Sequence, residues 1–180
     1  MNRLVKTFKY GFQKMISKPG WDTIYVLVDM HETVLVPTWS TAPSETIYPK
    51  AVETLRLMSQ HPNIKLILWS SSLPETNLKY QREFKERGVI FSAINANPFE
   101  EDTVYADFKS KPYMSVILDD KAGFDAKDDW EALYDYFISL KAFDLLYKAH
   151  HQLVKPHEKQ EVDKFFNELI VDSKYLIPNT

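Results

Sequence analysis

The stretch Thr23-Ile-Tyr-Val-Leu-Val-Asp29 decides the fold of this chain. Its apolar residues are mostly β-branched or aromatic and no polar residue interrupts them, which is typical of a strand buried on both faces. Such strands occur in parallel sheets whose faces are covered. The run ends at the carboxylate of Asp29, so the predicted strand delivers an acidic side chain to one edge of the sheet.

Strand and helix patterns alternate along the rest of the chain. Apolar runs predict further strands at residues 64–69, 89–94 and 114–118. Helical spacing of apolar residues predicts helices at residues 50–60, 72–87, 129–146 and 159–170. Ser72 and Glu75 have the spacing of an N-cap box, and Gly88 is a typical helix stop. This alternation predicts one α/β domain with a doubly wound, mostly parallel sheet of the Rossmann-like kind.

We expect residues 1–180 to form a single domain with helical extensions at both ends. Residues 1–20 hold five basic side chains and no acidic one, at the spacing of an amphipathic helix. This helix is expected to dock on a core of residues 21–146, with contact to a membrane surface, targeting or binding of a polyanion as the alternatives. Residues 147–180 are expected to be a helical extension. No apolar run is long enough for a transmembrane segment.

Composition excludes several classes of site. The 180 residues include no cysteine, which excludes disulfides and thiolate metal sites and favours a reducing, cytoplasmic location. With four glycines in all, no glycine-rich phosphate loop of the Walker or dinucleotide-binding type exists. A net charge of −3 disfavours binding of nucleic acid over the whole surface, although a local basic patch remains compatible with it.

Polar side chains follow three of the predicted strands directly. Asp29, Ser70 and the pair Asp119-Asp120 each come immediately after an apolar run. Ligands of open α/β sheets bind outside the carboxyl ends of the strands, so these groups are expected to meet at one edge. Two carboxylates about 4 Å apart repel by roughly 4 kcal/mol at an effective dielectric constant near 20. A divalent cation such as Mg²⁺ would neutralise them, and Lys111, with Lys109 as the alternative, would add positive charge.

These residues, in this order, resemble the four motifs of the haloacid dehalogenase (HAD) superfamily. The resemblance covers residues 23 to about 130 and rests on Asp29-Met-His-Glu-Thr33, Ser70, Lys111 and Asp119-Asp120. Trp69-Ser70-Ser71 and the stretch from Lys111 to Lys121 are most similar to the small phosphatases of the superfamily, including its nucleotidase-like members.

The resemblance implies a phosphohydrolase that uses an aspartyl-phosphate intermediate. Asp29 would be the nucleophile, and Lys111 would offset the charge of the substrate. Ser70, Ser71 and Thr33 would bind the phosphoryl group. The resemblance also implies a Mg²⁺ ion held by Asp29, Asp120 and Asp119 and by the backbone carbonyl of residue 31.

Residue 31 departs from the pattern of the family. Its phosphatases normally carry a second aspartate two residues after the nucleophile, as general acid for the leaving group, and this chain has His31. Imidazolium is a competent acid near neutral pH, so His31 is predicted to take that catalytic role. The same substitution also fits a catalytically silent member that keeps the phosphate pocket.

The spacing of the motifs leaves no room for an inserted cap domain. Thr33 to Ser70 spans 37 positions and Ser70 to Lys111 spans 41, and each interval must already hold a helix. We therefore expect an open site, which favours either a large substrate or a lid supplied by residues 37–49, by the C-terminal helices or by another subunit. The expected substrate is a phosphorylated small molecule or nucleotide. A phosphatase that processes nucleic-acid ends, with residues 1–20 as its contact surface, is the less favoured alternative.

Overall fold

The structure is a computed structural model that describes residues 2–18, 20–38, 44–153 and 158–164. The chain divides into two compact units, residues 1–134 and 135–180. All four strands and the candidate site belong to the first unit. Within the described residues, every helix is too short or too polar to cross a lipid bilayer.

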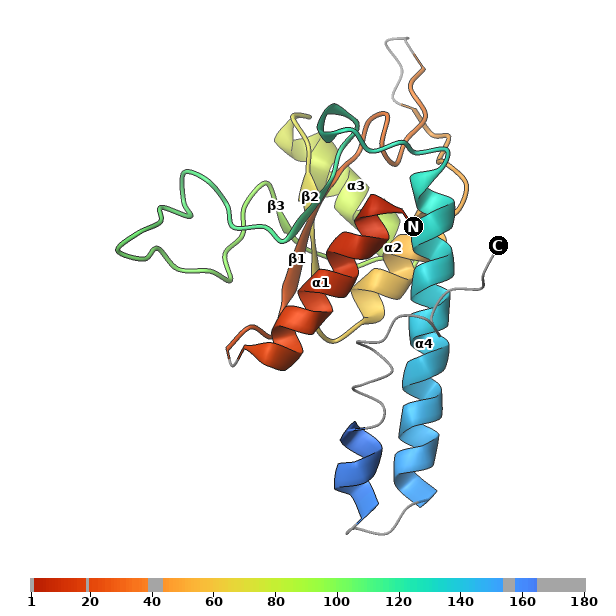
Figure 1. The fold of residues 1–180 in the computed structure, drawn as a ribbon. Helices are drawn as coiled ribbons and strands as arrows, with labels where there is room; N and C mark the ends of the chain where they lie inside the picture. The colour runs from red at the N-terminus through yellow and green to blue at the C-terminus, as the bar shows by residue number, and fades with distance from the viewer. Residues whose placement is uncertain (1, 19, 39–43, 154–157, 165–180) are drawn as a thin grey trace. The chain divides into compact units, whose positions relative to one another are not determined.

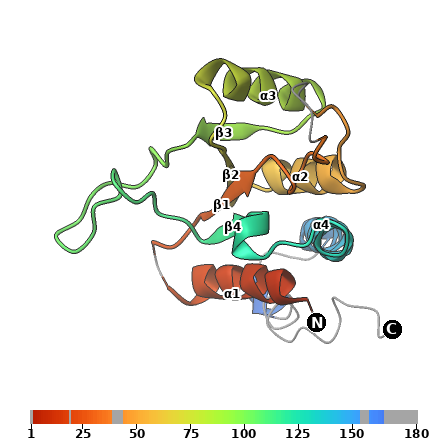
Figure 2. The same cartoon turned by 90° about the horizontal axis from the view of Figure 1, so that it is seen from above.

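The first unit is built on a four-stranded parallel sheet (Figure 1) with the order β3-β2-β1-β4, in which all four strands are labelled in Figure 2. The α/β fold with a parallel sheet and flanking helices, expected from the sequence, is confirmed. The strands lie within or close to the predicted runs. Their bounds are β1 Ile24–Asp29, β2 Ile64–Trp69, β3 Phe91–Ile94 and β4 Val116–Leu118.

The register of the sheet aligns the strand ends. Asp29 is the Cα partner of Trp69, and Val28 is the partner of Leu118. The next residues along the chain, Ser70 and Asp119, therefore leave the sheet beside Asp29. This is the crevice at the carboxyl ends of the strands where open α/β sheets bind ligands.

Helices follow the predicted apolar spacing, with differences at their ends. They are α1 Arg3–Ser17, α2 Ala51–Gln60, α3 Pro74–Glu86 and α4 Asp129–Leu153, and a short 3-10 turn, η1, covers Asp120–Ala122. α4 extends past the predicted end because no glycine or proline occurs before Pro156. Of the helix predicted at residues 159–170, residues 159–164 are helical and the remainder lies outside the described residues.

The prediction that Ser72 caps α3 is wrong. The N-cap residue is Leu73, no side chain caps the helix, and Pro74 occupies its first turn. Ser72 instead turns back toward the end of β2, where its backbone N–H donates to the Ser70 hydroxyl at 3.2 Å. A local partner thus holds Ser72, and the preset φ of proline starts the helix.

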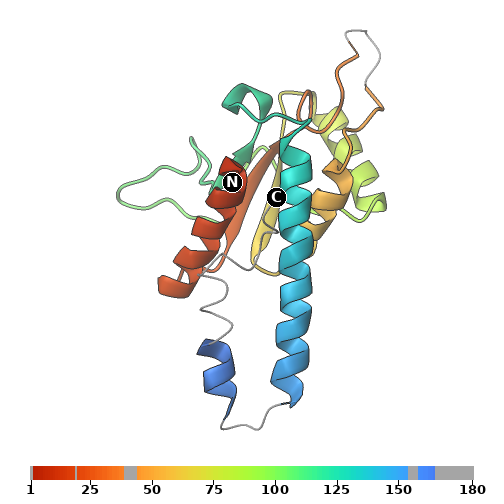
Figure 3. The same ribbon diagram turned by 45° about the vertical axis from the view of Figure 1, so that its right-hand side comes forward.

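α1 packs along β1 and β4 with one face of the helix (Figure 3). Leu4, Val5 and Phe8 on this face are buried, and Phe8 has no exposed surface. The helix approaches the sheet closely at Gly11, where an added Cβ would lie 2.9 Å from the Ile24 side chain. Gly11 therefore allows the close approach of α1 to the beginning of β1.

The crossover from β3 to β4 contains no helix. Residues 95–115 make it as an irregular segment that extends from the sheet on the side away from α2 (Figure 2). Phe99 stacks on the ring of Tyr25 with centroids 6.2 Å apart, and Tyr113 meets the same ring edge-on at 6.1 Å. These aromatic contacts cover the Tyr25 ring, near the beginning of β1, with side chains from a segment that holds no helix.

Phe8→Ala should destabilise the protein strongly, because it removes the side chain that anchors α1 to the sheet and leaves a cavity. We expect a loss of about 3–5 kcal/mol in the free energy of unfolding, measured by urea denaturation. Thr7→Ala, one residue away on the exposed side of α1, is the matched control and should change it by less than about 0.5 kcal/mol. If both variants changed the free energy of unfolding by the same small amount, the packing of α1 on the sheet through Phe8 would be contradicted.

Candidate functional site

Three carboxylates converge at the carboxyl edge of the sheet. One oxygen from each of Asp29, Asp119 and Asp120 lies within 4.8 Å of the other two, and all three residues are half-buried. β1 delivers Asp29, and the turn after β4 delivers the other two. Oxygen ligands at this spacing suit a hard divalent cation. The aspartates predicted to hold a metal are thus brought together, and their geometry fits that group.

The pKa of Asp29 is raised, chiefly by burial. Burial raises the pKa of Asp29 to about 6, and the charges of Asp119 and Asp120 act in the same direction. Hydrogen bonds from the Met30 backbone and the Thr33 side chain act against this rise but do not cancel it. With this pKa, the Asp29 carboxyl group is still mostly ionised at pH 7. A cation bound among the three aspartates would reduce the repulsion between their carboxylates and lower the pKa of Asp29.

Thr33 connects the two loops that carry the aspartates. The fully buried Thr33 hydroxyl accepts a hydrogen bond from the Asp120 backbone N–H at 3.0 Å. The same side chain hydrogen-bonds Asp29. The backbone carbonyl of Thr33 accepts from the indole N–H of Trp130 at 2.8 Å, at the start of α4. These contacts of Thr33 hold the acidic residues in place, and its role in binding phosphate stays a prediction.

Lys121 is the cation nearest to the carboxylates. Its ammonium group pairs with Asp120 and, at 3.1 Å, with Glu32. Burial alone would raise the pKa of Asp120, but hydrogen bonds with Lys121 and Glu32 hold that pKa below its usual value. Sequence reasoning did not assign a role to Lys121. Its position next to Asp120 was the available signal.

Ser70 is held by two asparagines that sequence reasoning missed. Asn95, at the end of β3, accepts from the Ser70 N–H at 2.8 Å and donates to its carbonyl at 2.6 Å. Asn95 has a φ of +51°, which asparagine tolerates better than most residues. Asn77 on α3 donates to the Ser72 carbonyl at 2.9 Å. The buried Ser70 hydroxyl bonds Ser72 at 3.1 Å, while Ser71 is exposed beside it.

His31 directs its imidazole toward α3. Its Nε2 atom lies 3.2 Å from the hydroxyl of the buried Tyr80, and the rings meet edge-on with centroids 5.9 Å apart. The three-residue acidic cluster contains no imidazole. The metal contact predicted for residue 31 runs through its backbone carbonyl and stays a prediction. The sequence pattern did not indicate this contact between Tyr80 and His31.

Lys111 lies in the segment that precedes β4, whereas Asp119 and Asp120 follow that strand. The segment enters the sheet where the Ser115 N–H donates to the Tyr25 carbonyl at 2.9 Å, near the beginning of β1. Lys111 itself is exposed, and among the described residues no ion pair joins it to the aspartates. Its alternative, Lys109, pairs with Asp102 at 2.9 Å. The catalytic role of Lys111 stays a prediction.

Among the described residues, no cap domain is inserted between Thr33 and Ser70 or between Ser70 and Lys111. Between Thr33 and Ser70 the described elements are a short antiparallel pairing in which Leu35 faces Ile47, then α2 and β2. The Ser44 hydroxyl donates to the Val36 carbonyl and reinforces this pairing. Residues 39–43 lie outside the described residues, so the lid predicted at residues 37–49 is only partly described.

Comparison with known proteins adds little to this geometry. No protein-family model matches the chain, and no curated protein matches it. One solved structure, of a conserved protein from Bacteroides thetaiotaomicron, is similar to this chain with 24% sequence identity. The match covers 69% of this chain and 98% of that chain, with a TM-score of 0.47. Function is therefore inferred from the site itself.

Asp29→Asn should stabilise the metal-free protein at neutral pH. An aspartate whose pKa is raised in the folded state binds protons more tightly when folded, so its ionisation lowers stability as pH rises from about 4 through 6. After allowance for solvent screening at a half-buried site, the expected gain at pH 7 is about 1–2 kcal/mol. Thermal denaturation in EDTA measures it.

Two controls accompany this measurement. The gain should disappear at pH 4, where the wild-type carboxyl group is largely protonated in the folded state. Asp128→Asn, a substitution at an exposed aspartate, should leave stability unchanged at both pH values. A variant that is less stable than wild type at pH 7 would show that Asp29 is adequately compensated.

Proposed function

We propose that this chain is a magnesium-dependent phosphohydrolase that cleaves a phosphate monoester through an aspartyl-phosphate on Asp29. The observation that carries the proposal is the cluster of Asp29, Asp119 and Asp120, tied together by Thr33 at the carboxyl edge of the sheet. This is the placement that the resemblance to the HAD superfamily implies. The proposed substrate is a phosphorylated small molecule or a nucleotide, and the described residues include no cap domain over the site.

Asp29 attacks phosphorus in the first step. A carboxylate oxygen forms the new P–O bond while the ester P–O bond breaks and its electron pair leaves with the alcohol oxygen. His31 supplies the proton that the leaving oxygen takes up. Water then attacks the aspartyl-phosphate, releases inorganic phosphate and restores the Asp29 carboxylate.

Asp29, Asp119 and Asp120 would hold the Mg²⁺ ion. When bound, such an ion supplies positive charge that offsets the repulsion between an anionic nucleophile and an anionic phosphate. Ser70 and Ser71, at the end of β2, are the proposed phosphoryl-binding hydroxyls. The two hydrogen bonds between the Asn95 side chain and the Ser70 backbone fix that backbone and so limit the positions available to the hydroxyl.

A catalytically silent phosphate-binding domain is the second candidate. The contact between His31 and Tyr80 favours it, because it turns the imidazole toward α3 rather than toward the aspartates. The absence of an ion pair between Lys111 and the cluster, among the described residues, supports the same view. The two candidates differ in turnover and share phosphate and metal binding.

Asp29→Asn should abolish hydrolysis while leaving the fold intact. The amide of the variant cannot form the acyl-phosphate, because it lacks the carboxylate oxygen that attacks phosphorus. For the same reason the wild-type protein should form a stable beryllofluoride adduct and the variant should form none. A panel of phosphorylated metabolites and nucleotides with Mg²⁺, read by phosphate release, measures activity. Asp128→Asn is the control and should retain it. Wild-type rates in Asp29→Asn would exclude Asp29 as nucleophile.

Mg²⁺ should raise the melting temperature of the wild-type protein by mass action, since the folded state alone brings the aspartates together. At a concentration 100 times the dissociation constant, the expected stabilisation is about 2.7 kcal/mol. Asp120→Asn should reduce this shift strongly, and Asp128→Asn should preserve it. A melting temperature that does not respond to Mg²⁺ in wild type would contradict the metal site.

His31→Ala should slow alkyl phosphates far more than p-nitrophenyl phosphate, because a good leaving group needs little proton donation. General acids contribute about 10²- to 10⁴-fold, which sets the expected loss on alkyl phosphates. His31→Asp should keep or increase activity. Equal losses on both substrates would exclude His31 as the acid. Activity that appears only in His31→Asp would establish the silent candidate.

A further inference from the structure

The outer face of α1 is a concentrated basic surface on an acidic protein. Lys6 and Lys18 are exposed and Lys14 is half-buried, and no acidic residue occurs in residues 1–20. Arg3 is also exposed, but it pairs with Asp129 at 3.6 Å. The whole chain carries a net charge of −3, so the rest of its surface is more acidic still. Such a separation of charge marks the contact surface for an anionic partner.

Exposed aromatic rings interleave with these basic groups. Tyr10 is 59% exposed and Trp21 is 42% exposed. The Lys14 ammonium lies 4.7 Å from the centroid of the Tyr10 ring and 4.6 Å from that of Trp21. Lys18 approaches the same indole at 5.9 Å. Positive charge and aromatic faces are therefore presented together.

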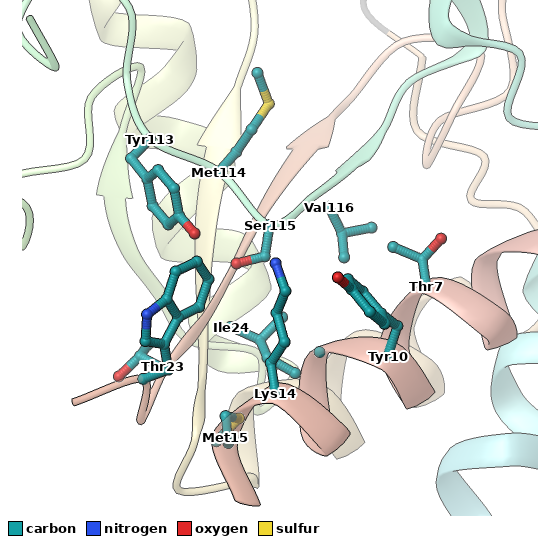
Figure 4. A pocket seen from close by; sticks show the side chains of 12 residues that line it. Thr7, Tyr10, Lys14, Met15, Thr23, Ile24, Tyr113, Met114, Ser115 and Val116 are labelled. Atoms are coloured by element: carbon teal, nitrogen blue, oxygen red, sulfur yellow. The ribbon is translucent and has the colours of Figure 1, made fainter. Parts of the chain in front are cut away.

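A pocket of about 150 Å³ opens beside these rings, between α1, the beginning of β1 and residues 113–116 (Figure 4). Tyr10, Trp21 and Tyr113 contribute aromatic rings to its lining, and the Lys14 ammonium lies close to the rings of both Tyr10 and Trp21. Ser115 adds a hydroxyl, and no acidic side chain lines the pocket. Planar aromatic groups that carry negative charge are the ligands that suit such a lining.

We propose that the basic face of α1 and this pocket bind single-stranded nucleic acid. The phosphates would contact the lysines, and an unpaired base would stack on Trp21 or Tyr10, which is how proteins bind single strands without sequence preference. The 15 residues of α1 make a helix about 22 Å long. Lys6 and Lys14 lie about 12 Å apart along its axis and Lys18 follows its end, a spacing that can follow a few phosphates. This inference does not depend on the proposed hydrolysis, since it uses none of the three aspartates.

The burial of α1 argues against a lipid surface as the partner. Helices that bind membranes insert their apolar face. Here Leu4, Val5 and Phe8 are buried against the sheet, with exposed fractions of 8%, 4% and 0%. The outward face offers ammonium groups and two aromatic rings. Aromatic rings also distinguish a single strand from a duplex, because bases in a duplex already stack on one another.

Fluorescence anisotropy with a labelled deoxythymidine 12-mer that lacks a terminal phosphate monoester, in EDTA, tests the proposal. Trp21→Ala should weaken binding at least about fivefold, and Trp21→Phe should retain most of it. Lys14→Ala should lower the slope of log affinity against log salt by about 0.7. Lys79→Ala, an exposed lysine paired with Glu83 on α3, is the matched control and should change neither.

Three results would overturn the proposal. The first is equal affinity in wild type, Lys14→Ala and Trp21→Ala, with thermal melts showing all of them folded. The second is binding to thymidine monophosphate as tight as to the 12-mer. The third is binding to vesicles of anionic phospholipid but not to the oligonucleotide. Asp29→Asn should bind the 12-mer like wild type, so a failure of the proposed hydrolysis and a failure of this surface are measured separately.

Discussion

The parallel pairing of β1 with β2 on one side and β4 on the other is the interaction on which the site depends. Each strand ends at the same edge, so the residues that follow are brought together whatever their separation along the chain. The register is strongly specified because β1 is buried on both faces along its apolar length. A shift by one residue would turn Asp29 to the opposite face of the sheet and separate it from Asp119.

The convergence that creates the site also carries a free-energy cost. Asp29 is half-buried next to two other carboxylates, and its pKa is raised to about 6. The buried Thr33 hydroxyl holds this arrangement by bonding both loops, and Trp130 holds Thr33 from α4. A site whose charges repel in the absence of a ligand is one that gains stability when a cation binds. Burial is the larger cause of the raised pKa of Asp29, and the charges of Asp119 and Asp120 add to it.

α1 shows how one short helix can serve stability and recognition at once. Its apolar face completes the core of the first unit, and Gly11 permits the close approach to Ile24 that this packing needs. Because that face is used internally, the basic residues are directed outward. Trp21, at the end of the connection to β1, remains exposed beside Lys14. The amphipathic pattern that made a membrane contact plausible is therefore accounted for by packing within the protein.

The sequence by itself determined the parallel sheet and the principal acidic residues, because apolar runs that end in polar residues have one low-energy arrangement in an α/β fold. Asp29, Ser70, Asp119 and Asp120 were identified by position alone. Only the tertiary structure showed the contacts of Asn95 with Ser70, of Tyr80 with His31 and of Lys121 with Glu32. It also showed that the N-cap expected at Ser72 does not form. The periodicity of apolar residues indicates which face of a helix or strand is buried. These contacts, in contrast, join side chains from separate loops and helices, and they form only when the whole chain packs.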